Sequence, residues 1–165
     1  MSKKQKYIRQ VTSPFLFRLF CIKELPMLLL AGIRVNKITD EEAVTSIRYG
    51  YLTKNPFRSV YFACLGMAAE LSSGVIAMMY VQDASPGVSM LVTNMKASFV
   101  KKAKGRILFS CGDGRKIADA FTETQSSGEG VTVEVHSKGT DESGEIVAEF
   151  WITWSFKKKI PKESI

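Results

Sequence analysis

The sequence predicts an α+β domain in which a mostly antiparallel sheet wraps around one long buried helix. Residues 60–80 are almost free of charge and rich in Ala, Met, Leu and Gly, so a helix over them has to be enclosed on all sides. The strand-like segments fall in groups rather than alternating with helices, which favours antiparallel pairing. In the last segment, residues 146–156, apolar side chains recur at every second position, as in a strand with one buried face.

Shorter signals predict the remaining elements. Ser13 and Pro14 precede apolar residues at helical spacing, so we expect an amphipathic helix over residues 13–30, broken at Pro26. β-branched and polar residues alternate on either side of an acidic turn, which predicts a hairpin with strands at 33–37 and 43–48. Further strands are expected at 88–99, 106–111 and 131–137, and a short helix at 115–124. The chain therefore divides into an N-terminal helical extension, residues 1–30, and one domain over residues 31–160.

Composition narrows the class of protein. With 45% hydrophobic and 24% charged residues, the 165-residue chain is neither disordered nor collagen-like. Its 23 basic residues exceed its 16 acidic ones by seven, which suggests an anionic partner such as acidic lipid or a phosphate-bearing ligand. The basic runs lack a recognised nucleic-acid reader motif, so no nucleic-acid partner is expected.

The cysteines and the apolar segments indicate the cellular compartment in which the protein is expected. The three cysteines lie far apart without a CxxC pair or histidine companions, so neither a disulfide framework nor a metal site is predicted, and a reducing cytoplasm is expected. Charged residues and Pro26 interrupt the N-terminal apolar stretch, which argues against a signal peptide. Residues 60–81 could span a bilayer by length, but the central Glu70 and the glycines favour a core helix.

Glu70 is the most informative residue of the predicted central helix. It stands among Gly66, Met67, Leu71 and Gly74, where an unpaired carboxylate is costly unless it is protonated, paired or facing a wet cleft. Such surroundings are typical of carboxylates that take part in acid–base chemistry. The alternative is an acid that pairs with a basic residue of the sheet or faces solvent.

The start of the same helix is a second candidate site. Asn55 and Pro56 form a turn that leads the chain into the helix, whose first N–H groups lack intrahelical acceptors and could hold an oxyanion. The structural alternative is a simple Asn-Pro turn with Ser59 as a helix cap.

Together these features resemble the hotdog-fold thioesterase superfamily, and most closely its phenylacetate-pathway thioesterases and an uncharacterised bacterial branch. The residues that carry the resemblance are Asn55, the stretch from Tyr61 to Ala63, where those enzymes have His-Gly-Gly, and Glu70, where they have an acid further along the helix. The resemblance implies a hotdog fold over residues 31–160 with an added N-terminal helix.

The resemblance also implies an activity, that of a thioesterase acting on acyl-CoA or acyl carrier protein. Glu70 would serve as general base or nucleophile, Asn55 would orient the water or thioester, and the N–H groups near Tyr61, Phe62 and Ala63 would stabilise the oxyanion. The cleft would lie between subunits of a homodimer or homotetramer, with no cofactor beyond the coenzyme A of the substrate. Residues expected to bind substrate are Met67 and Leu71 in the pocket and the basic Lys101, Lys102, Lys104 and Arg106.

Three rival interpretations stay open at this point. Because Tyr61-Phe62-Ala63 replaces His-Gly-Gly, the chain could be a non-catalytic binder of acyl or lipid ligands. The basic residues ahead of the apolar N-terminal helix would suit an acidic membrane, although packing over the dimer or the ligand tunnel is favoured. A hotdog dehydratase is disfavoured, since it needs a histidine in the cleft and His136 is expected at the surface of a late strand.

Overall fold

Three helices form the N-terminal extension of the structure, a computed structural model that describes residues 2–159. They are α1 (Lys3–Thr12), α2 (Pro14–Glu24) and α3 (Pro26–Leu30). The expected helix behind Ser13 and its break near Pro26 are therefore confirmed, whereas α1 was not predicted. Its sequence signal is a capping box: the Gln5 amide donates to Ser2 Oγ, and the Ser2 amide donates to Gln5 Oε1, each at 3.1 Å.

All the predicted strands are present and form one antiparallel sheet. In the order in which they lie side by side, they are β1 (Arg34–Ile38), β2 (Ala43–Arg48), β4 (Arg106–Cys111), β5 (Val131–Thr140), β6 (Ile146–Lys158) and β3 (Val88–Phe99). Within the described residues, β1 and β3 are thus the edges of the sheet. The division of the chain at residue 30 stays a prediction, and its far boundary, residue 160, lies outside the described residues.

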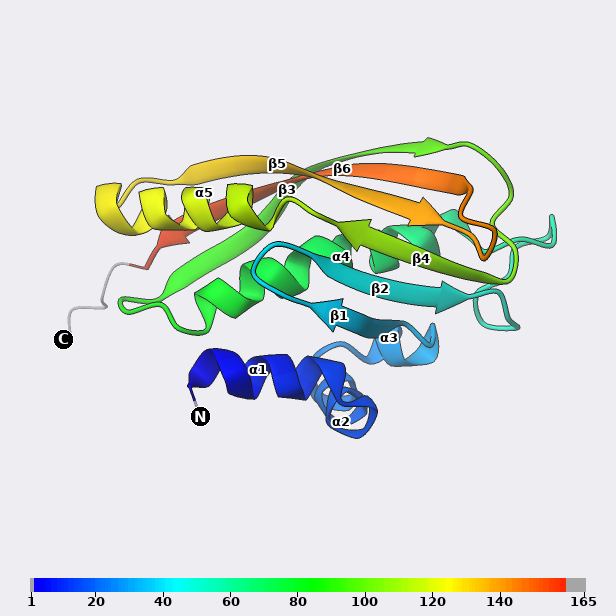
Figure 1. The fold of residues 1–165 in the computed structure, drawn as a ribbon, viewed down its shortest axis with the longest axis horizontal. Helices are drawn as coiled ribbons and strands as arrows, with labels where there is room; N and C mark the ends of the chain where they lie inside the picture. Colours follow the sequence, from blue (N-terminus) through cyan, green and yellow to red (C-terminus); the bar gives the residue numbers. More distant parts are fainter. Residues whose placement is uncertain (1, 160–165) are drawn as a thin grey trace.

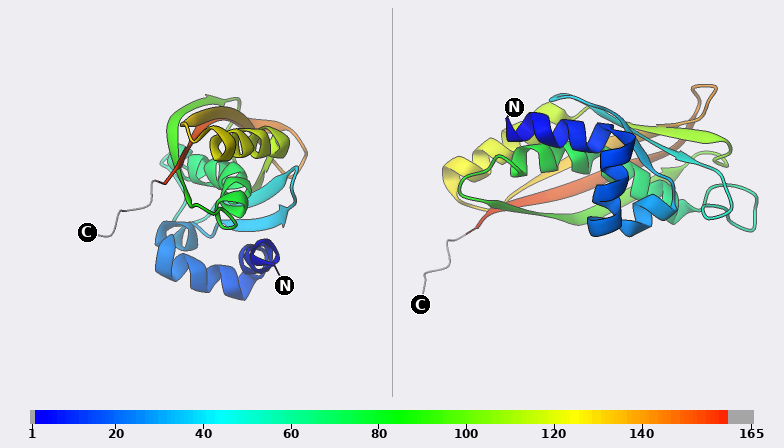
Figure 2. Two further views of the ribbon diagram at one scale, coloured as in Figure 1. Left: turned by 90° about the vertical axis from the view of Figure 1, so that its left-hand side faces the viewer. Right: turned by 90° about the horizontal axis from the view of Figure 1, so that it is seen from below.

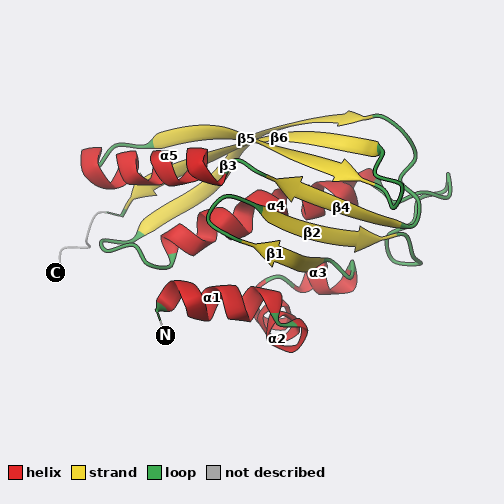
Figure 3. Cartoon of the chain, viewed as in Figure 1, coloured by secondary structure: helices red, strands yellow, loops and turns green. Residues whose placement is uncertain are grey.

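The central helix α4 (Phe62–Val81) runs through the curve of this sheet (Figures 1 and 3). The α+β hotdog architecture is therefore confirmed: the strands wrap around α4, as the end-on view in Figure 2 shows. Helix α5 (Gly114–Ser127) lies beside α4 and β5, and its Phe121 ring packs edge-on against Phe156. By length and hydropathy α4 could cross a membrane, but 56% of its most apolar window is buried within the fold.

Three polar contacts between α4 and the sheet fix which way α4 is rotated. Toward the sheet, Thr45 of β2 donates to the carbonyl of Ala68 at 2.7 Å, and the hydroxyls of Ser72 and Ser137 lie 2.7 Å apart. Trp154 Nε1 of β6 donates to Ser73 Oγ at 2.9 Å. Because buried polar groups are costly when unpaired, these bonds favour one helix rotation. A different stripe of α4 then faces a cavity, and its residues are Met67, Glu70, Leu71, Gly74, Val75 and Met78.

The N-terminal helices lie across the side of α4 that the sheet leaves open (Figure 2). Helix α1 contacts β1 and α4, and Lys4 forms an ion pair with Asp40 in the turn after β1. Tyr7, Val11, Phe17 and Cys21 bury their side chains against the domain. The extension is therefore an integral part of the core and closes one wall of the cavity beside Glu70.

Gly114, the first residue of α5, is a position where no side chain fits. A Cβ there would lie 2.1 Å from the Asp40 carbonyl oxygen, and that contact involves backbone that cannot rotate away. We predict that Gly114→Ala lowers the free energy of unfolding by about 2 kcal/mol, because the turn after β1 must shift. Urea denaturation measures this, with Gly112→Ala as the matched control, since a Cβ at Gly112 meets nothing within 4 Å. Equal stability of the two variants would contradict the packing described here.

Candidate functional site

Glu70 lies on the wall of an apolar cavity of about 460 Å³. One side of the cavity is the stripe on α4, the second consists of Met90 of β3 and Trp154 of β6, and the third is the N-terminal extension. The extension contributes Tyr7, Val11, Phe17, Phe20, Glu24, Leu25, Pro26, Met27 and Leu28. The predicted substrate-pocket residues Met67 and Leu71 therefore do lie beside Glu70.

The Glu70 carboxyl group has been taken largely out of water without receiving a partner. An ideal Cβ at Gly74 would be 3.2 Å from Glu70 Oε1 and 3.3 Å from the Trp154 ring, so the carboxyl group lies along its own helix, next to the indole. No side chain in residues 2–159 forms a hydrogen bond or ion pair with it. Burial raises the pKa of Glu70 from its ordinary 4.5 to about 7. At neutral pH the group is thus half protonated, as suits a group that accepts and returns protons.

Tyr7 and Glu24 are site residues that sequence reasoning missed. Tyr7 is buried on α1 at the same cavity, and its pKa is raised first by burial and second by the charge of Glu70. Glu24 is the second carboxylate of the cavity lining, but it is exposed and lies 3.1 Å from Lys23 Nζ. The Ser2–Gln5 capping box predicts α1, and so could have indicated that Tyr7 belongs to an ordered helix.

The start of α4 lines a different cavity, of about 490 Å³. The predicted residues found there are Asn55, Tyr61, Phe62, Lys101 and Lys102, joined by Phe99 at the end of β3. The Tyr61 amide donates to the Thr53 carbonyl at 2.7 Å, so it is not available to an oxyanion. The Phe62 and Ala63 amides, at the first two positions of α4, have no acceptor among the described residues and remain suitable donors, although Phe62 lines this cavity and Ala63 does not.

The Asn55 side chain holds the turn before α4 together. Its Oδ1 accepts from the amides of Phe57 and Ser59 at 3.0 and 3.1 Å, and its Nδ2 donates to Ser59 Oγ at 3.0 Å. Ser59 is therefore hydrogen-bonded to Asn55 and is not the helix cap that the sequence suggested, since the N-cap residue of α4 is Tyr61. Asn55 acts here by shaping the loop that presents the helix start.

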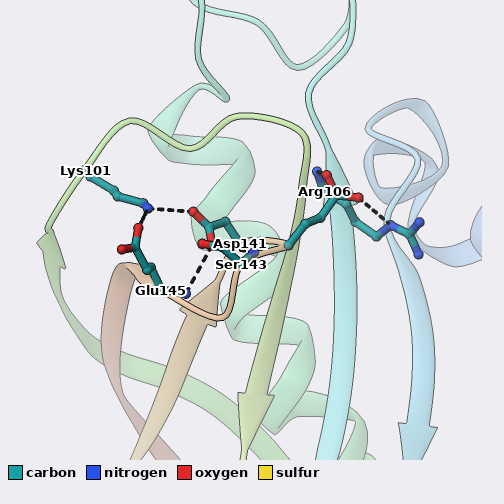
Figure 4. Close-up of polar contacts among 6 residues, drawn as sticks. Lys101, Arg106, Asp141, Ser143 and Glu145 are labelled. Carbon is teal, nitrogen blue, oxygen red and sulfur yellow. Dashed lines mark hydrogen bonds and ion pairs between the residues drawn. The ribbon is translucent and has the colours of Figure 1, made fainter.

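Two of the four predicted basic residues form ion pairs with acidic residues of the turn between β5 and β6 (Figure 4). Lys101 Nζ lies 2.7 Å from Asp141 Oδ2 and also pairs with Glu145, and the Lys101 ammonium lowers the pKa of Asp141. Arg106 Nε lies 3.9 Å from Glu142 Oε1. Lys102 and Lys104 are exposed and form no ion pair within the described part of the chain. Only Lys102 combines a free charge with a place on the helix-start cavity.

Within one chain, the two halves of the expected site are separate. Phe62 and Glu70 are eight residues apart on one helix, which corresponds to about 12 Å along its axis. Lys104 and Arg106 line neither cavity. The Glu70 cavity therefore holds a carboxyl group without an oxyanion hole, and the helix-start cavity holds amide donors without a base.

His136 lines neither cavity. On β5 its neighbours Val135 and Ser137 are buried toward α4, so His136 projects from the opposite face, where it stacks on Trp151 with ring centroids 5.1 Å apart. Its Nε2 lies 3.0 Å from Glu149. His136 therefore lies on the face of the sheet that points away from α4.

Comparisons with known proteins support this architecture. The profile of a family described as Domain of unknown function (DUF4442) matches residues 14–156. The chain matches no curated protein sequence. Its fold is shared by a Pseudomonas aeruginosa protein named as a probable thioesterase, with TM-score 0.73 and 22% identity over 91% of this chain and 99% of that one.

Two further structures share the fold at lower identity. A thioesterase from Haemophilus influenzae has TM-score 0.64 and 10% identity, with 91% of this chain and 94% of that chain covered. A mutant thioesterase from Pseudomonas aeruginosa has TM-score 0.65 and 16% identity, with 89% of this chain and 96% of that chain covered. These likenesses confirm that the fold is that of the hotdog thioesterases.

The raised pKa of Glu70 predicts a specific pH dependence of stability. Between pH 4.5 and 7 the unfolded chain binds fewer protons at this carboxyl than the folded chain does, so ionisation favours unfolding. Relative to Glu70→Gln, the wild type should lose up to about 3 kcal/mol of unfolding free energy across this range, and nothing further above it. Urea denaturation of both proteins at a series of pH values measures the difference. Parallel curves would show that Glu70 is not buried as described.

Proposed function

For this chain, which belongs to the DUF4442 family, we propose hydrolysis of acyl thioesters at a site shared by two subunits. The substrate is an acyl group carried on coenzyme A or on an acyl carrier protein, and no other cofactor takes part. The observation that carries the proposal is the unpaired Glu70 carboxyl in an apolar cavity, with its pKa near 7. A cavity of this size and lining suits an acyl chain, and a carboxyl with this pKa suits a general base.

We expect the chain to form a homodimer through β3, which is an edge strand of the sheet within the described residues. Met95 and Phe99 of β3 are large apolar residues that stay exposed, at 41% and 50%, and the strand is twelve residues long. A long apolar edge is a template for pairing with another strand. Its twin on a second copy would pair with it antiparallel around a two-fold axis.

That pairing joins the two half-sites. If the whole of β3 pairs about its midpoint, the partner's Phe99 lies opposite Val88, two residues from Met90. Phe99 lines the helix-start cavity and Met90 lines the Glu70 cavity. The partner's first α4 amides would thus face the carboxyl group of Glu70 across the interface. Two such sites form in each homodimer, and a homotetramer would contain four.

The reaction needs no group beyond those present. The Glu70 carboxylate takes a proton from water, whose oxygen forms a bond to the thioester carbonyl carbon. The N–H groups of the partner's Phe62 and Ala63 hold the resulting oxyanion. Collapse of this intermediate breaks the carbon–sulfur bond, and the thiolate of coenzyme A leaves with the proton returned by Glu70. Lys102, at the rim of the helix-start cavity, is the basic residue best placed for the phosphates of coenzyme A, and a cytoplasmic location fits this substrate.

One observation favours a second candidate, a binder of acyl ligands without catalysis. The rings of Tyr61 and Phe62 lie with centroids 4.8 Å apart at the helix start, so the place of the His-Gly-Gly of related enzymes is crowded. Ligand binding without turnover would support this alternative.

We predict that Glu70→Gln lowers kcat for acyl-CoA hydrolysis by about 10²-fold or more, because the base is lost while the shape of the cavity is kept. Release of free thiol from acyl-CoA substrates of increasing chain length measures the rate. Glu24→Gln is the matched control, since Glu24 lines the same cavity but is exposed and paired with Lys23. If wild type and both variants bind acyl-CoA but none hydrolyses it, the non-catalytic alternative replaces the hydrolase.

A second prediction concerns the amide donors at the helix start. Phe62→Pro removes one N–H at the first helical position, where proline fits because Tyr61 before it is extended at φ −63° and ψ 135°. We expect about 10²-fold lower kcat, whereas Phe62→Ala keeps the N–H and loses only the ring, so it should stay far more active.

The shared site makes the two inactive variants complementary. In a mixed dimer of Glu70→Gln and Phe62→Pro subunits, one site carries both changes and the other carries neither. Mixing and reassociating the two variants should therefore restore activity to the mixed dimers. A site contained within one chain would give no restoration, and monomeric wild type in sedimentation experiments would exclude the shared site altogether.

A further inference from the structure

The net positive charge of the protein is concentrated in its N-terminal helices. Residues 1–30 contain six Lys or Arg and one acid, Glu24, so they supply five of the seven excess positive charges of the chain. Of these basic residues, Arg18 is exposed on α2 and has no acidic partner among the described residues. The rest of the chain is nearly balanced, so this local excess needs its own explanation.

Helix α2 is apolar on two opposite faces. Phe17 and Cys21 are buried against the domain, whereas Phe15, Leu19 and Ile22, spaced four and three residues apart, lie on the other side and are exposed at 69%, 50% and 62%. A surface helix normally has one apolar stripe and a polar opposite face. The second apolar face of α2 is therefore without a partner in the described part of the chain.

Further exposed apolar residues follow along the chain, and some of them belong to the wall of the cavity beside Glu70. Leu25, Met27 and Leu30 are also exposed, with Met27 at 59%, and together with Phe15, Leu19 and Ile22 they form what we call the α2–α3 face. Leu25, Pro26 and Met27 at the same time line the cavity. Leu25 and Met27 are thus both exposed and part of the cavity wall. Arg18 and Lys23 lie on α2 beside its exposed apolar residues, and the Lys23 side chain is 83% exposed although its Nζ lies 3.1 Å from Glu24.

We propose that the α2–α3 face docks the protein on an anionic lipid surface, with its apolar side chains in the interface and Arg18 and Lys23 against the headgroups. Large apolar residues beside basic ones are the composition of helices that lie in a membrane interface. A second copy of the chain fits this face less well, because a two-fold contact would set the same cationic residues against each other. The proposal does not depend on thioester hydrolysis.

Vesicle co-sedimentation of the full chain tests the docking, with phosphatidylcholine vesicles that contain or lack phosphatidylglycerol. We expect binding to the anionic vesicles that weakens at high salt, and little binding to phosphatidylcholine alone. Phe15→Ser combined with Ile22→Ser should reduce binding at least about tenfold, and so should Arg18→Glu combined with Lys23→Glu. The changed side chains are exposed, and circular dichroism checks that each variant folds.

The matched control places the same chemical change on another exposed apolar pair. Tyr51 and Leu52, in the loop after β2, are exposed at 80% and 65%, and Tyr51→Ser with Leu52→Ser should leave vesicle binding unchanged. Equal loss in this control, or no binding of wild type to anionic vesicles, would overturn the proposal. If the α2–α3 variants instead change the oligomeric state in sedimentation equilibrium without changing vesicle binding, a second copy covers the face and the lipid proposal is wrong.

Discussion

The hydrogen bonds that anchor α4 to the sheet are the constraint on which the rest of the structure depends. Ser72 bonds to Ser137 and Ser73 accepts from Trp154, so the apolar helix cannot rotate freely within the curve of the sheet. Since the rotation is set by these partners, Glu70 is held at the cavity. Its carboxyl group then loses water without gaining a cation, and burial raises its pKa to about 7.

The N-terminal helices complete this environment and also explain why one chain is not enough. Tyr7 and Phe17 form the cavity wall opposite α4, so the extension excludes water from Glu70. The amide donors lie at the start of α4, where Phe62 and Phe99 of the edge strand β3 line the same cavity. An apolar cavity with a base and a second cavity with oxyanion donors become one site only through a symmetric partner.

Much of the fold could be predicted from the sequence because each element has a strong local signal. The almost uncharged stretch over residues 60–80 and the period-two pattern over residues 146–156 predicted the central helix and the last strand to within about two residues. Helix α1 was missed because its mean composition is polar, and only the Ser2–Gln5 cap signals it. The sequence also indicated Glu70 as a candidate site residue. It could not show that the Asn55 side chain hydrogen-bonds within its own loop, because that bond depends on the local conformation of the chain. Nor could it show that Asp141 pairs with Lys101, because that contact joins two turns that are distant in the sequence.

Above all, the fold keeps the Glu70 carboxyl group in an apolar cavity without a partner among residues 2–159. Carbon-13 NMR titration of side-chain carboxyls in the full-length protein, with the Glu70 signal assigned by its loss in Glu70→Gln, measures this directly. We predict a midpoint near pH 7 for that one signal. A midpoint near 4.5, the ordinary value for a hydrated glutamate, would contradict it.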